Sequence, residues 1–125
     1  LNSIWEGAGN IMALDLLRGL QRAGPDVAAA LEVELQPLSG LGAACDAARD
    51  RVLRRLQGAV DEHDGRRLAQ DLALTVQAAL LRRLAPDFVF EAFAASRLGD
   101  SPGLAYGSLP PSTDFERLLR RAAPV

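Results

Sequence analysis

The sequence predicts an all-α fold, an antiparallel helical bundle of about five to six helices. Apolar residues recur every three or four positions along most of the chain, the spacing that gives a helix one apolar face. No stretch alternates apolar and polar residues at every second position, as a half-buried strand would. Gly and Pro lie between the periodic segments, where they end one helix and begin the next.

We expect a first helix over residues 10–22, with Asn10 as its N-cap, ended by Gly24-Pro25. Its large apolar side chains cover more than one stripe, so we expect it to pack on two sides. These side chains are Ile11, Met12, Leu14, Leu16, Leu17 and Leu20. Pro25 suits the first turn of a second helix over 26–36, which Pro37 and the Ser-Gly pair at 39–40 end.

A third helix is predicted over 41–59 and a fourth over 65–84, separated by the polar segment 61–65. In the third, the inward positions are Leu41, Ala44, Cys45, Ala48, Val52, Leu56 and Ala59, which leaves Arg49, Arg51, Arg54 and Arg55 largely outside. In the fourth, the inward positions are Leu68, Leu72, Val76, Ala79 and Leu80. Arg82 and Arg83 close its last turn, where the helix dipole favours cations.

Pro86-Asp87 opens a fifth helix, whose apolar residues are Phe88, Val89, Ala92 and Phe93. The Gly- and Pro-rich segment 99–111 is predicted to be a loop. Ser112-Thr113-Asp114 then starts a short last helix.

Composition sets limits on the class of protein. The 125 residues carry 14 basic and 16 acidic side chains, a net charge of −2, which is less basic than a dedicated DNA-binding domain. No apolar run is long enough to cross a bilayer, so we expect no membrane contact. Cys45 is the one cysteine, so it forms no internal disulfide, and it fits a reducing cytoplasm. Because the chain opens on Leu1 with no signal peptide, we expect it to be a piece of a longer polypeptide.

The most informative segment is Trp5-Glu6-Gly7-Ala8-Gly9-Asn10, which places a carboxylate beside an indole and a two-glycine turn before a helix. Glycines let another group approach the backbone, and the free amides at a helix start attract oxygen atoms. An apolar wall disfavours the charged form of a carboxylate, which makes it a better base. These features also describe an ordinary solvated turn with a capping Asn, and no strand precedes the glycines as a dinucleotide fingerprint requires.

Residues 1–18, LNSIWEGAGNIMALDLLR, resemble the C-terminal signature of the acyl-CoA dehydrogenase flavoproteins. In that superfamily an aromatic-Glu-Gly-Thr turn enters a helix of the C-terminal bundle. The Trp-Glu-Gly-x-Gly-Asn form, followed by Leu-Asp-x-Leu-Arg, is most similar to the alkylation-response (AidB-type) branch, and a long helical extension also fits that branch. The resemblance implies that residues 1–24 end the dehydrogenase-type helical domain and that residues 25–125 form a helical extension bundle.

The resemblance also implies a role for each residue of the turn. Glu6 falls where many members keep the catalytic base that removes the α-proton of an acyl thioester while a hydride leaves the β-carbon for FAD. Trp5 falls beside the flavin and acyl pocket, and the residues expected to touch FAD are Trp5, Gly7, Ala8, Gly9 and Asn10. Ala8 stands where a Thr is usual, and Asn10 where Gln is commoner, so efficient dehydrogenation of a standard acyl-CoA is not assumed.

The parent is therefore expected to be an oxidoreductase, and this fragment alone is expected to be inactive and to retain no FAD. Its expected partners are the missing N-terminal and β domains of the parent, a second subunit in a homo-oligomer, and an acyl-CoA-type thioester.

Binding of duplex DNA, with which this branch is associated through its C-terminal helical region, is the alternative function, together with oligomerisation. The candidate phosphate-binding residues are Arg18, Arg49, Arg51, Arg54, Arg55, Arg66 and Arg67. Acidic residues share the same stretch, so a self-neutralising solvated face is the competing interpretation, and no aromatic residues interleave for base stacking.

Four further residues have polar side chains that could bind a ligand or form a contact. His63 lies among acidic residues but has no second His or Cys to complete a metal site, so we expect a solvated turn and no metal. Tyr106 either anchors the loop 99–111 or faces a partner. Asp15 and Arg18 are spaced to form a surface ion pair.

Overall fold

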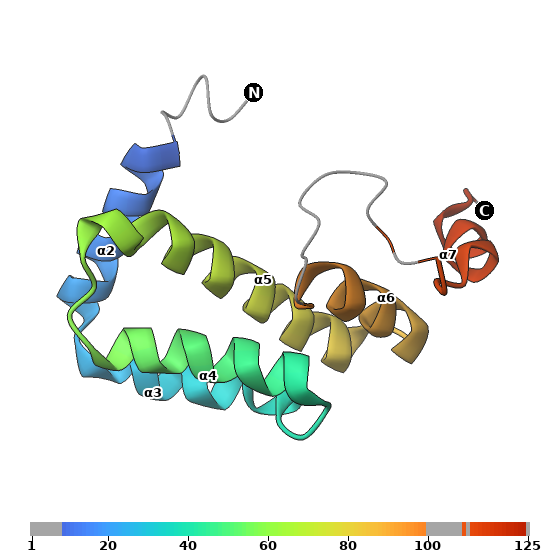
Figure 1. Cartoon of the computed structure of the whole chain (residues 1–125), viewed down its shortest axis with the longest axis horizontal. Helices are drawn as coiled ribbons and strands as arrows, with labels where there is room; N and C mark the ends of the chain where they lie inside the picture. The colour runs from blue at the N-terminus through green and yellow to red at the C-terminus, as the bar shows by residue number, and fades with distance from the viewer. Residues whose placement is uncertain (1–8, 100–108, 110, 125) are drawn as a thin grey trace.

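The computed structural model describes residues 9–99, 109 and 111–124, and within these residues the regular secondary structure is helical, with turns between the helices and no strand. The all-α prediction is confirmed at this level, and the arrangement is that of a helical bundle (Figure 1). The α-helices are α2 (Gly9–Ala23), α3 (Pro25–Glu34), α4 (Ala43–Gln57), α5 (Gly65–Leu84), α6 (Asp87–Arg97) and α7 (Phe115–Ala122). Two short 3-10 helices, η1 (Gln36–Leu38) and η2 (Glu62–Asp64), lie between them.

Helix α5 is the centre of the bundle. It contacts α2 near its start, α4 along its length and α6 near its end, and η1 also packs on it (Figure 1). Helices α3 and α4 lie side by side and complete the layer next to α5. Because α5 touches nearly every other element, the fold depends on its apolar positions being covered on several sides.

Glycine makes the sharp turns that bring consecutive helices together. Gly24, between α2 and α3, has φ of 69°, and Gly40 and Gly42, before α4, have φ of 75° and 122°. These values lie in the left-handed region that side chains with a Cβ rarely adopt. Pro25 then takes the first position of α3, where its missing N–H costs no hydrogen bond.

The core is formed where η1, α4, α5 and α6 meet. Its fully buried members are Leu35 just after α3, Leu38 in η1, Val52 in α4 and Ala78 in α5, with Cys45, Ala48, Ala79, Phe90 and Leu98 packed around them. Leu35 and Leu38 lie at the end of α3 and in η1, where the chain tightens after Glu34. The second helix was expected to continue to Gln36, and it ends two residues earlier because this tightening turns both leucines towards α5.

Helix α2 is joined to the bundle by a close contact with the first residue of α5. A Cβ built on Gly65 would lie 2.8 Å from Leu17 Cδ1 and 3.9 Å from Ala13 Cβ. Ala13 and Leu17 are buried by this contact, and Gly65 is buried with them. The absence of a side chain at position 65 therefore allows α2 to lie directly against α5.

Several expectations about which residues face inward are wrong. Leu41 and Ala59 are exposed because α4 is shorter than predicted and runs only from Ala43 to Gln57. Ala44 and Leu80 are also exposed. Ile11 and Met12 are exposed, so α2 does not pack on two sides at its N-terminal end. Conversely, the side chains of Arg49 and Arg55 are mostly buried, because α4 is covered by α3 on one side and by α5 on the other.

The last helix, α7, lies at the edge of the structure (Figure 1). Asp114 caps it as the sequence predicts, since its side chain accepts a hydrogen bond from the backbone N–H of Arg117 at 3.0 Å. The Arg117 guanidinium stacks over the Phe88 ring of α6 at 4.1 Å from the ring centre. Phe115 and Leu119 remain exposed on its apolar face.

Candidate functional site

The turn with the strongest sequence signal lies before the described residues. Trp5, Glu6, Gly7 and Ala8 fall outside them, so the site is seen only where it enters the bundle, at the start of α2. That helix begins at Gly9, which places Asn10 inside the helix and not at the N-cap position expected for it. The first turn of α2 carries no acidic side chain. The start of a helix carries a partial positive charge.

The described part of α2 next to this turn presents an apolar surface. Ile11 and Met12, within one turn of Gly9, are both exposed. Further along, Arg18 Nη1 lies 3.0 Å from Asp15 Oδ1, the surface ion pair that the spacing predicts. Arg18 is therefore neutralised locally.

Two of the four arginines predicted to face solvent on α4, Arg51 and Arg55, are held by a carboxylate on α5. Asp71 Oδ2 accepts hydrogen bonds from Arg51 Nε at 3.2 Å and from Arg55 Nη1 at 2.9 Å. The side chain of Asp71 is 13% exposed, that of Arg55 25% and that of Arg51 43%. This arrangement, called here the Asp71 clamp, joins α4 to α5 and pairs two of the candidate phosphate ligands with a carboxylate.

Two more arginines of α4 are also engaged. Arg49, whose side chain is mostly buried, lies 3.9 Å from Glu32 of α3 and 3.4 Å from Asp50. Arg54 is exposed, and its Nε donates to the backbone oxygen of Asp50 at 3.3 Å. Helix α4 thus presents no array of free guanidinium groups.

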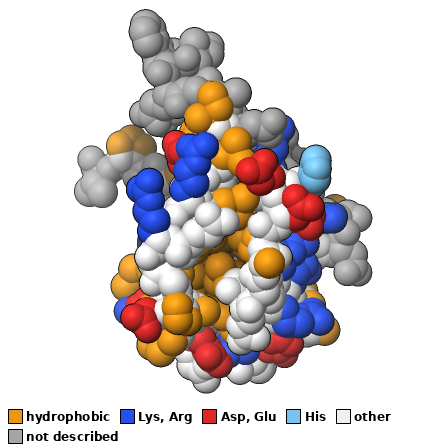
Figure 2. All heavy atoms as spheres, turned by 90° about the vertical axis from the view of Figure 1, so that its left-hand side faces the viewer, with side chains coloured by type: hydrophobic (Ala, Val, Ile, Leu, Met, Phe, Trp, Pro, Cys, Tyr) orange, Lys and Arg blue, Asp and Glu red, His pale blue; other side chains and the backbone are white. Residues whose placement is uncertain are grey.

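Arg66 and Arg67, in the first turn of α5, differ from the others. Neither has a carboxylate partner within 4.0 Å in the described part of the chain, and both are exposed. They line a shallow groove whose floor is formed by Met12 and Leu16 of α2. Figure 2 shows this side of the molecule, where basic and acidic side chains are interspersed around the hydrophobic ones.

Asp71 is the residue that the sequence interpretation missed. Its signal was present, because it lies three residues after the buried Leu68 and four before the buried Thr75, on the inward face of α5. A carboxylate on an inward face requires a cationic or hydrogen-bonding partner. Only the packing of α4 on α5 reveals that Arg51 and Arg55 are the partners.

The remaining candidates are His63, Cys45 and Tyr106. His63 lies in the exposed turn η2, where its backbone N–H donates to Asp61 Oδ1 at 3.3 Å, and no group of metal ligands is found across residues 9–99, 109 and 111–124. Burial, and next the charge of Asp46, raise the pKa of the Cys45 thiol, which favours the unreactive protonated form. Tyr106 lies outside the described residues.

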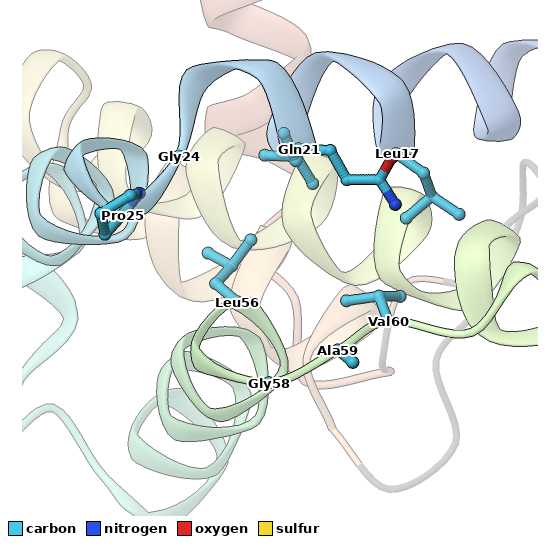
Figure 3. A pocket seen from close by; sticks show the side chains of 9 residues that line it. Leu17, Gln21, Gly24, Pro25, Leu56, Gly58, Ala59 and Val60 are labelled. Atoms are coloured by element: carbon cyan, nitrogen blue, oxygen red, sulfur yellow. The ribbon is translucent and has the colours of Figure 1, made fainter.

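A pocket of about 440 Å³ lies where α2 and α4 end (Figure 3). Leu17, Leu20 and Gln21 of α2 form one wall, and Leu56, Ala59 and Val60 form the other. Gly24 and Pro25 close it at the turn into α3. The walls are mainly apolar, and no charged side chain lines them.

Comparison with protein families, with curated proteins and with solved structures finds no match to this chain. Among the helices that the structure describes, none is long and apolar enough to cross a membrane.

Proposed function

We propose that this chain is the C-terminal helical part of an FAD-dependent, acyl-CoA dehydrogenase-like oxidoreductase. In it, the chain completes the flavin and acyl site and contributes to packing between subunits. One observation carries the proposal: the segment that resembles the family signature leads directly into α2, and α2 is anchored by the Leu17–Gly65 contact. An anchored helix gives the preceding turn a fixed point of attachment, which a group that must meet a cofactor requires.

The described start of α2 fits a bound flavin. Its first turn contains no carboxylate to compete for the free amides, which suit the carbonyl and phosphate oxygens of FAD. The exposed side chains of Ile11 and Met12 offer apolar contact nearby. Polypeptide beyond this chain would supply most of the cofactor's contacts, with this segment contributing Trp5, Gly7, Ala8, Gly9 and Asn10.

Each residue of the turn then has one task. FAD, when bound, supplies an acceptor for the hydride from the β-carbon of an acyl thioester. The Glu6 carboxylate accepts the α-proton, and the Trp5 indole keeps water from that carboxylate, which makes it a stronger base. Ala8 provides a backbone amide but no hydroxyl, so hydrogen bonds to the cofactor at this position come from the main chain alone.

The test is Glu6→Gln in the full-length, FAD-loaded parent. We expect exchange of the α-proton of an acyl-CoA with deuterated water to fall by about 10²–10⁴-fold, since a positioned base contributes that factor. Flavin absorbance should be unchanged, because the amide has the same shape as the carboxylate. Glu62→Gln, in the exposed turn η2, is the matched control and should exchange at the normal rate.

Two results would contradict the proposal. Unchanged exchange in Glu6→Gln would show that another group is the base. A parent that purifies without flavin and does not take up added FAD would remove the assignment altogether. The 125-residue chain by itself should be colourless and inactive.

Duplex DNA binding is less well supported by the described residues. Five of its seven candidate arginines are engaged by carboxylates or by the backbone, and Arg66 and Arg67 remain. Two free guanidinium groups predict at most weak, salt-sensitive binding without sequence preference.

A further inference from the structure

We propose that the pocket between the ends of α2 and α4 binds a small neutral molecule with an aliphatic body and one amide group. This inference is independent of the proposed flavin chemistry, because the pocket lies at the opposite end of α2 from the turn at residues 5–8. A volume of about 440 Å³ falls in the range of about 300–1,000 Å³ that small-molecule pockets occupy.

The walls select an aliphatic body. The pocket is lined by Leu17 and Leu20 of α2, Leu56 of α4 and Val60 of the segment that follows α4. Figure 3 shows Leu17, Leu56 and Val60 around it. Burying apolar surface against such side chains is favourable by about 0.8 kcal/mol for each methylene. The turn at Gly24, with its φ of 69°, fixes the angle between α2 and α3 and so keeps the pocket open in the structure.

The absence of charge selects a neutral molecule. Three other hollows in the described part of the chain each have charged side chains in their lining, whereas this pocket has none. Two helices, α2 and α4, end here with their partly negative carbonyl ends. The one helix that begins here, α3, opens with Pro25, which has no N–H to offer, and the N–H of Val27 already bonds to the Gly24 oxygen at 3.3 Å. A carboxylate would therefore find only the neutral Gln21 amide as a side-chain donor, which does not offset the water that a full charge loses on burial.

Gln21 selects the amide. It is the polar side chain of the lining, and it is exposed, so a ligand that enters the pocket can reach its amide group. A glutamine amide both donates and accepts, so it matches a primary or secondary amide of the ligand through two complementary hydrogen bonds. The free carbonyls at the end of α4 accept any further N–H.

The test uses octanamide as the probe and octanoate, of equal chain length, as its charged counterpart. Binding to the full 125-residue chain is followed by ¹H–¹⁵N correlation spectra. We expect saturable shifts at the amides of Gln21 and Gly58, with an affinity at least tenfold higher for octanamide than for octanoate. Shortening octanamide to hexanamide should weaken binding by about fourfold per methylene.

Two variants locate the site. Ala59→Phe, at an exposed position of the lining, should fill the pocket and weaken octanamide at least tenfold, whereas Ala73→Phe, on the exposed face of α5, should have no effect. Gln21→Met, which keeps the length of the side chain, should weaken octanamide about fivefold but leave toluene binding unchanged. If Ala59→Phe fails to fold by circular dichroism, Gln21→Met decides alone.

The inference is overturned if octanamide shows no saturable binding up to its solubility limit. Equal affinity for octanoate would also overturn it, as would shifts confined to the groove beside Arg66 and Arg67. These binding measurements need no flavin, so a failure to bind octanamide would not affect the oxidoreductase proposal. In the same way, a parent protein that lacks flavin would not affect the proposal that the pocket binds an amide.

Discussion

Replacing Asp71 by Asn tests the main electrostatic contact of the fold. The substitution keeps the shape of the side chain but removes the charge that Arg51 and Arg55 share at 3.2 and 2.9 Å. Both arginines would then be left beside a neutral amide, Arg55 in a position where only 25% of its side chain reaches solvent. The change should therefore loosen the contact between α4 and α5 without creating a cavity.

The size of the effect follows from exposure. Removing one partner of a fully buried ion pair costs about 3–5 kcal/mol, whereas an exposed pair is worth about 0.2–1 kcal/mol. Arg51, at 43% exposure, belongs near the lower range, and Arg55 lies between the two. We expect Asp71→Asn to lower the free energy of unfolding by about 2 kcal/mol, a large part of the roughly 5–15 kcal/mol that a small domain has.

Urea unfolding followed by far-ultraviolet circular dichroism measures this loss. Asp15→Asn is the matched control, because its pair with Arg18 is about two-thirds exposed, and it should cost less than about 0.5 kcal/mol. A double-mutant cycle of Asp71→Asn with Arg55→Gln should give a coupling of about 1 kcal/mol. If Asp71→Asn costs no more than Asp15→Asn, or if the cycle gives no coupling, the assignment of the clamp as a stabilising contact is refuted.

Three further predictions concern the core, the thiol and the free arginines. Leu38→Ala should lower the free energy of unfolding by about 2–5 kcal/mol and Leu84→Ala by less than about 0.5 kcal/mol in the same urea experiment, because Leu38 is fully buried and Leu84 is 77% exposed. Since the pKa of Cys45 is raised above its ordinary value of 9.0, the folded protein holds the thiol proton more tightly than the unfolded chain, so this residue's contribution to stability should fall as the pH rises past 9.0. Iodoacetamide should accordingly alkylate Cys45 slowly at pH 8 and rapidly in urea, and fast reaction without urea would contradict its burial. Any duplex affinity at low salt should be lost in Arg66→Glu/Arg67→Glu, and a titration in which this variant binds as well as the original would show that other residues contact the phosphates.

The sequence predicts the long central helix accurately. The prediction for α5 matches the structure at both ends, because Gly65 follows a polar segment and the two arginines at its end precede Pro86. Phe90 shows the limit of the same reasoning. The sequence predicts four other apolar residues of α6 as its apolar face, yet Phe90 is the buried aromatic residue of this helix. Which side of α6 is covered depends on how α5 packs against it, and that is set by the tertiary structure. Periodicity gives the face of a helix, and packing decides which part of that face is covered.

The pairing of charges was less predictable than the helices. The sequence places Arg49 and Arg55 on α4 among acidic neighbours, and the competing interpretation of a self-neutralising face anticipated their loss to carboxylates. Two of the partners, Glu32 and Asp71, come from other helices. Such pairs depend on which helices become neighbours, and spacing within one helix cannot supply that information.

The missing side chain at residue 65 has a practical consequence for anyone dividing this protein. The sequence resemblance implies a domain boundary at Gly24-Pro25, which would make it a natural place to cut. Yet Leu17 and Ala13 pack against Gly65. A fragment that starts at Pro25 would therefore expose the face of α5 beside Leu68 to solvent. Such a shortened version should aggregate or melt early, and residues 9–23 should be kept in any piece intended for crystallisation or spectroscopy.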